Sequence, residues 1–133
     1  MDVKELKERI EAARRVEATV NGATFTMVMP TDHQWRVCVQ ESRGEDGRVI
    51  DALAYRRLLE RALTGWSGVK CSDMMPGESE EALPFSPAAR ELLLDHRLDI
   101  VDELTIAFGA WLRDHRAKQE ESEKNSSGAS SGS

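Results

Sequence analysis

The segment Gly65-Trp66-Ser67-Gly68 comes nearest to the chemistry of an enzyme. In α/β hydrolases the nucleophilic serine sits in Gly-x-Ser-x-Gly, on a sharp turn that directly follows a strand. Here one residue is missing between the serine and the second glycine, and the apolar spacing before the segment predicts a helix. We therefore interpret the segment as a helix end, with Gly65 as the left-handed residue that terminates the helix.

Histidine and cysteine side chains are the next candidates, because both bind transition metals. His33 and Cys38 lie five residues apart, which on a helix places them about 140° from each other. One ion is not easily shared across that angle. Cys38 and Cys71 do not form a Cys-x-x-Cys motif, so we expect two free thiols in a reducing compartment. The spacing thus predicts no metal site.

The charged residues of the last predicted helix, at about 98–118, have a structural explanation. Its acids, Asp99, Asp102 and Glu103, lie in the first turns, where the helix dipole favours negative charge. Its last turns carry the cations that the dipole favours there, namely Arg113, His115, Arg116 and Lys118. No general acid and base stand out as a pair. We therefore expect a protein that is not an enzyme and needs no cofactor.

Length and charge restrict the remaining classes of function. The 133 residues fit a single small globular domain at 1–122, followed by a Ser/Gly-rich segment at 123–133 that we expect to be disordered. The net charge of −6 argues against a nucleic-acid partner, because phosphate binding needs clustered Lys and Arg. No apolar run is long enough to span a membrane and the N-terminus lacks a secretion signal, so we expect a cytoplasmic protein without a membrane partner.

The apolar spacing predicts an α+β fold that is mostly α. Asn21-Gly22 tolerates the positive φ angles of a type I′ turn, and the alternating residues on either side predict a β-hairpin at about 16–29. The predicted register makes one face of the hairpin apolar by pairing Val20 with Ala23, Ala18 with Phe25 and Val16 with Met27. Helices are expected to cover that face, at about 3–15, 32–43, 50–64, 87–95 and 98–118.

The helix expected at 32–43 begins with a capping box, in which Thr31 and Gln34 satisfy each other's backbone N–H groups. Gly44 is placed to end this helix in a left-handed conformation. A second pattern fits the same segment, because apolar and other side chains alternate from Trp35 to Gln40 as they do in a strand. A third strand at 35–40 is therefore the alternative to the helix.

Apolar side chains in the long connection at about 67–83, and in the last helix, are the best candidates for contacting a partner. Exposed Met and aromatic side chains are common in adaptable binding surfaces, and a terminal amphipathic helix can also mediate homo-oligomer formation. The alternative is that these side chains fold back onto the core, the last helix through a stripe that begins at Leu98. The candidate partner-binding residues are Trp66, Val69, Met74, Met75, Leu83, Phe85, Phe108 and Trp111.

Four short motifs in a fixed order resemble the tail assembly chaperones of long-tailed bacteriophages. The match spans roughly Val16 to Leu94. It consists of a glycine-turn hairpin, a Pro-Thr-Asp helix start, a Trp-x-Gly-Val segment and a Pro-Phe-Ser helix entry. The motifs are Gly22-Ala23-Thr24-Phe25-Thr26, Met29-Pro30-Thr31-Asp32, Leu63-Thr64-Gly65-Trp66-Ser67-Gly68-Val69 and Leu83-Pro84-Phe85-Ser86-Pro87.

This resemblance implies a non-enzymatic role in virion assembly in the cytoplasm of the bacterial host. Such a chaperone binds the long tape measure protein, keeps it soluble and helps to recruit tail tube protein. The alternative function is a small structural connector or minor tail protein that stays in the virion. A holdase needs accessible apolar surface together with net charge for solubility, and both are present in this chain.

Overall fold

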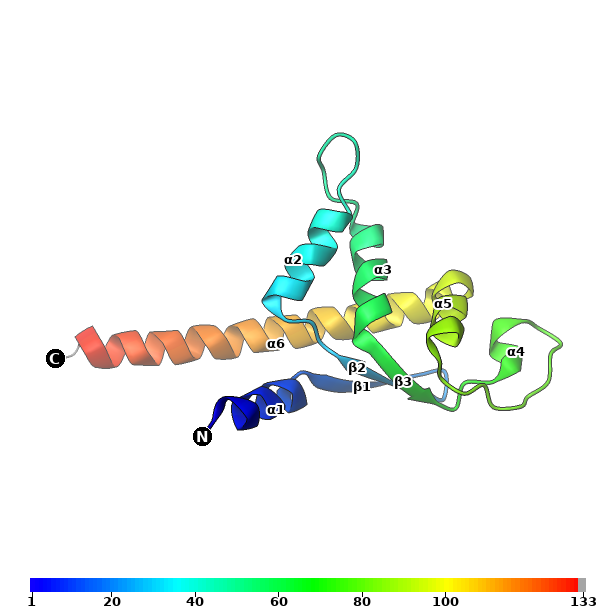
Figure 1. Ribbon diagram of the computed structural model, residues 1–133, viewed down its shortest axis with the longest axis horizontal. Coiled ribbons are helices and arrows are strands. Elements are labelled where there is room, and N and C mark those ends of the chain that lie inside the picture. Colours follow the sequence, from blue (N-terminus) through cyan, green and yellow to red (C-terminus); the bar gives the residue numbers. More distant parts are fainter. Residues whose placement is uncertain (132–133) are drawn as a thin grey trace.

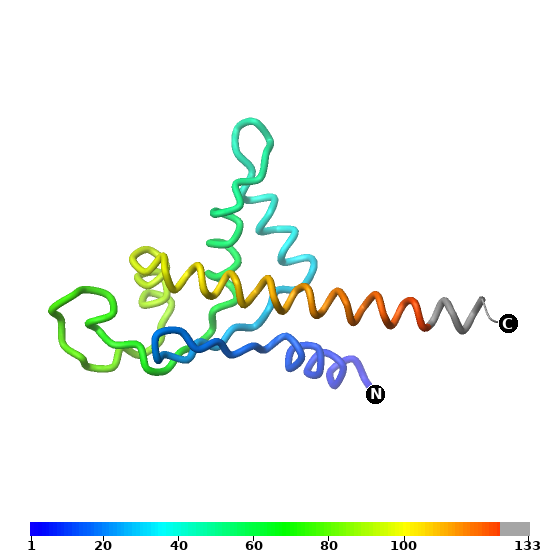
Figure 2. The backbone as a smooth tube through the Cα atoms, turned by 180° about the vertical axis from the view of Figure 1, so that it is seen from behind, coloured from blue at the N-terminus to red at the C-terminus, as the bar shows by residue number. Residues whose placement is uncertain are grey.

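The computed structural model describes the backbone of residues 1–131 and the side chains of residues 1–125. It confirms an α+β fold that is mostly α, with one small antiparallel sheet (Figure 1). In chain order the elements are α1 (Val3–Ala13), β1 (Arg15–Val20), β2 (Ala23–Val28), α2 (Asp32–Glu41), α3 (Asp51–Ala62), β3 (Leu63–Ser67), α4 (Cys71–Met74), α5 (Pro87–His96) and α6 (Leu98–Ser131). Seen from behind, α6 crosses in front of α2 and α3 (Figure 2).

The hairpin forms in the predicted register. Asn21 and Gly22 make the turn with φ angles of 52° and 81°, which explains why residues that tolerate positive φ stand there. Buried side chains alternate along β2, at Ala23, Phe25 and Met27, while the partner side chains on β1 are half-buried. The strands pair Val20 with Ala23, Ala18 with Phe25 and Val16 with Met27.

The third strand comes from 63–67, a segment that the sequence predicts as a helix end. β3 pairs antiparallel with β2, placing Trp66 opposite Phe25 and making β2 the central strand. The prediction that Gly65 ends a helix in a left-handed conformation is wrong: α3 ends at Ala62 and Gly65 lies within β3. The physical reason is the free edge of β2, whose backbone N–H and C=O groups need partners that a helix end cannot supply.

Residues 35–40 are helical, so the predicted helix is confirmed and its alternative, a strand, is not formed. The capping box is present: Thr31 Oγ1 accepts from the Gln34 N–H at 3.1 Å, and Gln34 Oε1 accepts from the Thr31 N–H at 2.9 Å. The prediction that Gly44 terminates this helix is wrong. Ser42 caps it instead, with a buried hydroxyl that donates to the Cys38 carbonyl at 2.6 Å.

One hydrophobic core lies between the apolar face of the sheet and the helices. α5 enters it as predicted, with Ser86 Oγ accepting from the Ala89 N–H at 3.0 Å and Pro87 as the first helical residue. The residues at its centre include Phe25 and Met27 of β2, Leu58 and Leu59 of α3, Leu93 of α5 and Leu104 of α6, each no more than 1% exposed. These contacts fix α6 across the fold.

The last helix is longer than predicted, and its apolar stripe starts later. α6 continues to Ser131, so most of the predicted disordered segment 123–133 has helical backbone, and residues 132–133 lie outside the described residues. Leu98 is exposed and Ile100 is buried in its place, because Ile100 lies one turn before Leu104 and therefore on the same face. Arg113, His115 and Arg116 consequently lie in the middle of the helix, where the dipole does not account for them.

Arg97 ties the start of α6 to the segment around α4. Its guanidinium donates to the two carboxylate oxygens of Asp99, at 3.0 and 2.8 Å, and to the backbone carbonyl of Asp73 at 2.7 Å. The hydrogen bonds from Arg97 are the main cause that lowers the pKa of Asp99 to about 2. A carboxylate whose pKa is lower in the folded state stabilises that state at higher pH and loses this contribution on acidification.

Removing the Arg97 guanidinium should bring the pKa of the Asp99 carboxyl back toward its usual value. In Arg97→Gln we expect the Asp99 pKa to rise from about 2 toward its usual 3.8, measured by NMR titration of the side-chain carboxyl carbon. The stabilising effect of the pair should be complete above about pH 4 and disappear as the pH falls toward about 2, in the sense that linkage requires. An Asp99 pKa that is equal in the two proteins would contradict this assignment.

Candidate binding groove

The predicted partner-binding residues separate into core residues and surface residues. Val69 and Phe108 are buried at 2% and 3% exposure, and Met75, at 61%, is exposed. The others, which are Trp66, Met74, Leu83, Phe85 and Trp111, are half-buried and pack against the core. The connection at 67–83 therefore presents little apolar surface apart from Met75.

That connection is folded into an arm, which we call the α4 finger (residues 70–82). At its base the Leu83 N–H donates to the Val69 carbonyl at 2.8 Å. Within the finger the Cys71 N–H donates to the Glu81 carbonyl at 3.0 Å, which joins its two sides. Gly68 lets the chain turn against the hairpin tip: its φ is 82°, and a Cβ there would lie 3.1 Å from the Gly22 carbonyl oxygen. The finger is an acidic projection at one end of the molecule (Figure 1).

Trp66 closes the base of the finger instead of facing solvent. Its indole Nε1 donates to the Leu83 carbonyl at 2.8 Å, and its ring meets Phe85 edge-on, with centroids 5.0 Å apart. A similar edge contact joins Trp66 to Phe25 at 6.1 Å. Trp66 and Phe85 thus link the finger to the sheet, which is the alternative that the sequence left open for them.

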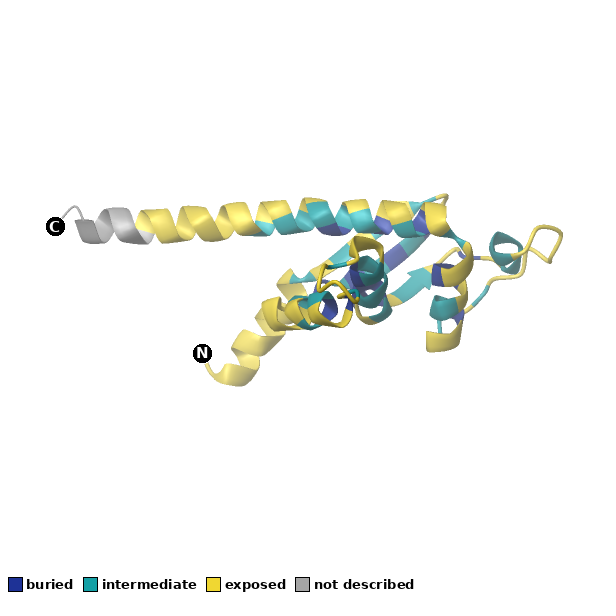
Figure 3. Ribbon diagram, turned by 90° about the horizontal axis from the view of Figure 1, so that it is seen from above, coloured by how far each residue is buried: buried dark blue, intermediate teal, exposed yellow. Residues whose placement is uncertain are grey.

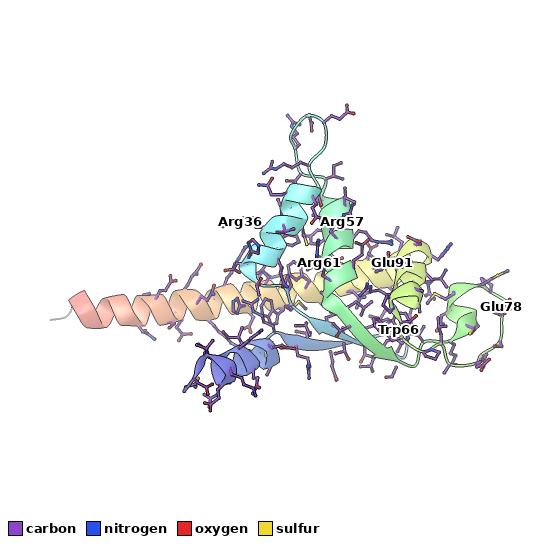
Figure 4. All side chains as sticks on the ribbon, viewed as in Figure 1. Arg36, Arg57, Arg61, Trp66, Glu78 and Glu91 are labelled. Carbon is purple, nitrogen blue, oxygen red and sulfur yellow. The ribbon has the colours of Figure 1, made fainter. Side chains whose placement is uncertain are left out.

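A groove of about 550 Å³ lies between α2 and the middle of α6, beside the junction of α1 and β1. Its volume is in the range of sites that hold a small ligand or a few side chains of a partner. In Figure 4, Arg36 on α2 and Glu78 on the α4 finger lie far from each other, so the groove and the finger are separate surfaces. Its lining residues are Arg14, Pro30, Asp32, Trp35, Arg36, Val39, Gln40, Arg43, Phe108, Trp111, Leu112, His115, Arg116 and Gln119.

The floor of the groove is aromatic. Trp35 of α2 contacts Phe108 of α6 with ring centroids 5.3 Å apart, and both contact Tyr55 of α3, at 5.9 and 6.3 Å. Aromatic pairs at these separations stabilise by about 0.5–1.5 kcal/mol beyond the area they bury. The cluster joins three helices and holds the two walls of the groove at a fixed distance.

Trp111 lines the groove beside this aromatic floor, and its ring contacts a histidine and an arginine. The His115 ring stacks on it at 4.6 Å with an interplanar angle of 11°. The Arg14 guanidinium lies 5.4 Å from the Trp111 centroid, within the range of a cation–π contact. Arg14 also donates to the Pro30 carbonyl at 2.6 Å, so its position over the ring is fixed.

The groove is strongly basic although the chain is acidic. Four arginines line it, Arg14, Arg36, Arg43 and Arg116, against one carboxylate, Asp32. In addition, His115 Nε2 is a buried polar atom without a hydrogen-bond partner in the described part of the chain. Buried polar groups in folded proteins almost always have such partners. The arrangement suits an apolar side chain on the aromatic floor and an anionic group at the rim.

The sequence points to two residues of the groove, Phe108 and Trp111, but not to its arginines. A helix that ends near 118 accounts for the cations Arg113, His115 and Arg116 through its dipole, so the sequence suggests no other role for them. The true length of α6 removes that explanation, and only the tertiary structure brings Arg14 and Arg36 to the same place. The useful signal was the pair of Trp111 and His115 at a spacing of four, which lie on one face of a helix.

Comparison with known proteins adds no family assignment. No family model, no curated protein and no solved structure matches the chain. Among the described helices none is both long and apolar enough to cross a membrane. Within the described residues no three His, Cys, Asp or Glu side chains gather as candidate ligands of a metal ion. The groove is therefore the feature of the molecule that bears on its function.

The indole hydrogen bond of Trp66 should make this residue structural. We expect Trp66→Phe to lower the free energy of unfolding by about 1–2 kcal/mol more than Trp35→Phe does, because it leaves the Leu83 carbonyl without its donor. In the described part of the chain the Trp35 indole donates no hydrogen bond, which makes Trp35→Phe the matched control. Urea unfolding measures both variants, and equal losses would contradict a structural role for the Trp66 N–H.

Proposed function

We propose that the protein is a non-enzymatic tail assembly chaperone of a long-tailed bacteriophage, and that it binds the tape measure protein in the groove between α2 and α6. The observation that carries this proposal is the aromatic floor of the groove beneath a rim of arginines. The four sequence motifs support the family: the hairpin and the two helix starts form as expected, while the motif at Leu63–Val69 forms β3 instead of the expected helix end. Its working place is the cytoplasm of the bacterial host, and a second partner is the tail tube protein.

The dimensions of the groove suit a helical client. An α-helix is about 10–12 Å across with its side chains, so it can lie along α6 and insert one or two side chains into a groove of about 550 Å³. α6 extends this seat, because its exposed part continues beyond the groove toward the C-terminus (Figure 3). A long helical client thereby contacts α6 over several turns instead of at one point.

A chaperone of this kind should raise the soluble fraction of its client. We expect coexpression of the wild-type protein with the tape measure protein of the same phage to increase the soluble client at least about threefold and to allow co-purification. Trp111→Ala should abolish most of this effect, because it removes the ring that carries Arg14 and His115. Quantitative gels of the soluble and insoluble fractions measure the client.

Met75→Ser on the α4 finger is the matched control, since Met75 is exposed and lies outside the groove. It should retain the wild-type effect, and circular dichroism verifies that both variants are folded. No gain in soluble tape measure protein with the wild type, together with no co-purification, would contradict the proposal.

The bare face of α1 favours one second candidate, a connector or minor tail protein that stays in the virion. α1 buries none of its residues, and its apolar side chains Val3, Leu6 and Ile10 are exposed at 82%, 49% and 46% (Figure 3). Such a stripe suits packing in a larger assembly, including a homo-oligomer. Mass spectrometry of purified virions separates the two functions, because a chaperone is absent from the finished particle and a connector is present.

A further inference from the structure

Most arginines outside the groove pair with a carboxylate, whereas those of the groove do not within the described residues. Six of the nine other arginines form ion pairs, and Arg9, Arg15 and Arg113 form none in the described part of the chain. Arg56 pairs with Glu60, Glu91 and Asp95 at 2.8–3.0 Å, and Arg61 pairs with Glu41 at 2.8 Å. None of the four groove arginines forms an ion pair within the described residues. The arginines that do are Arg48, Arg56, Arg57, Arg61, Arg90 and Arg97.

Two of the groove arginines have free guanidinium groups. Arg14 is held by the Pro30 carbonyl, and Arg43 donates to Gln40 Oε1 at 3.0 Å and to the Gly47 carbonyl at 2.7 Å. Arg36 and Arg116 are exposed, and neither makes a side-chain hydrogen bond in the described part of the chain. They stand on the two walls of the groove, one on α2 and one on α6.

We propose that this groove selects a client segment in which a carboxylate side chain follows an apolar one, with Arg36 and Arg116 binding the carboxylate and Trp35, Phe108 and Trp111 contacting the apolar group. The inference rests on the proposed function and names the chemistry of the client segment. Guanidinium groups match carboxylates in bidentate geometry.

The charges next to the groove favour an acidic peptide segment over a nucleic acid. Immediately after Gln119, α6 carries Glu120, Glu121 and Glu123, which are exposed. A phosphate backbone that follows α6 would meet this cluster and be repelled, whereas a helix can place acids at the arginines and basic residues beside the glutamates.

The test uses two fluorescein-labelled amphipathic helical peptides with the same Leu and Phe face, one with Glu and the other with Lys at the flanking positions. Fluorescence anisotropy with the full chain measures both affinities at about 0.15 M salt, where the Debye length is about 8 Å and charges outside the groove are screened. We expect the Glu peptide to bind at least about tenfold more tightly than the Lys peptide, since charge complementarity at an interface rejects like charge. Arg36→Glu and Arg116→Glu should each weaken the Glu peptide at least about fivefold.

Arg113→Glu is the matched control, because Arg113 lies on the same helix and does not line the groove. It should change the affinity less than about twofold. Equal binding of the two peptides, or equal weakening by Arg113→Glu, would overturn the inference. A labelled single-stranded DNA that binds more tightly than the Glu peptide and is weakened by Arg36→Glu would overturn it in favour of a nucleic-acid groove.

Coexpression separates this inference from the proposed function. If Arg36→Glu and Arg116→Glu still solubilise the tape measure protein as well as the wild type does, the acidic-segment inference fails while the chaperone function stands. If the wild type does not solubilise the tape measure protein but the peptides show the expected charge dependence, the function fails and the groove chemistry stands.

Discussion

The packing of Phe108 against Trp35 and Tyr55 is the contact on which the rest of the arrangement depends. It joins α6 to α2 and α3 at one point, and it is the place where the buried core ends and the groove begins. On one side of it α6 contributes Ile100 and Leu104 to the core. On the other side the same helix contributes Trp111 and His115 to an open surface. Core and groove are therefore two parts of a single helix packing.

This arrangement explains how a small acidic domain can offer a basic binding surface. The net charge of the chain is −6, and most arginines outside the groove pair with carboxylates, as in the contact between α3 and α5 through Arg56. Four arginines that form no ion pair within the described residues come together where α2, α6 and Arg14 meet. The net charge of a chain is a poor guide to the charge of one surface, because ion pairs neutralise charge in some places and leave it unpaired in others.

Local rules predicted the parts of the fold that local interactions determine. Asn21-Gly22 fixed the hairpin register, and Thr31 with Gln34 and Ser86 with Pro87 fixed two helix starts, each through hydrogen bonds or φ angles a few residues away. β3 could not be predicted in this way, since Leu63 and Trp66 also fit a helical spacing and only the free edge of β2 decides between the two. The groove arginines could not be predicted for the same reason. Whether an arginine pairs with a carboxylate depends on the tertiary structure, and no spacing in the sequence encodes it.

Site-specific photo-crosslinking tests most directly whether the client lies in the groove along α6. A photoreactive amino acid at Gln119, in the groove, is compared with one at Glu78, on the α4 finger. Each protein is coexpressed with the tape measure protein and irradiated. A client that lies in the groove gives a crosslinked product from position 119 and none from position 78. A product from position 78 with none from position 119 would contradict it.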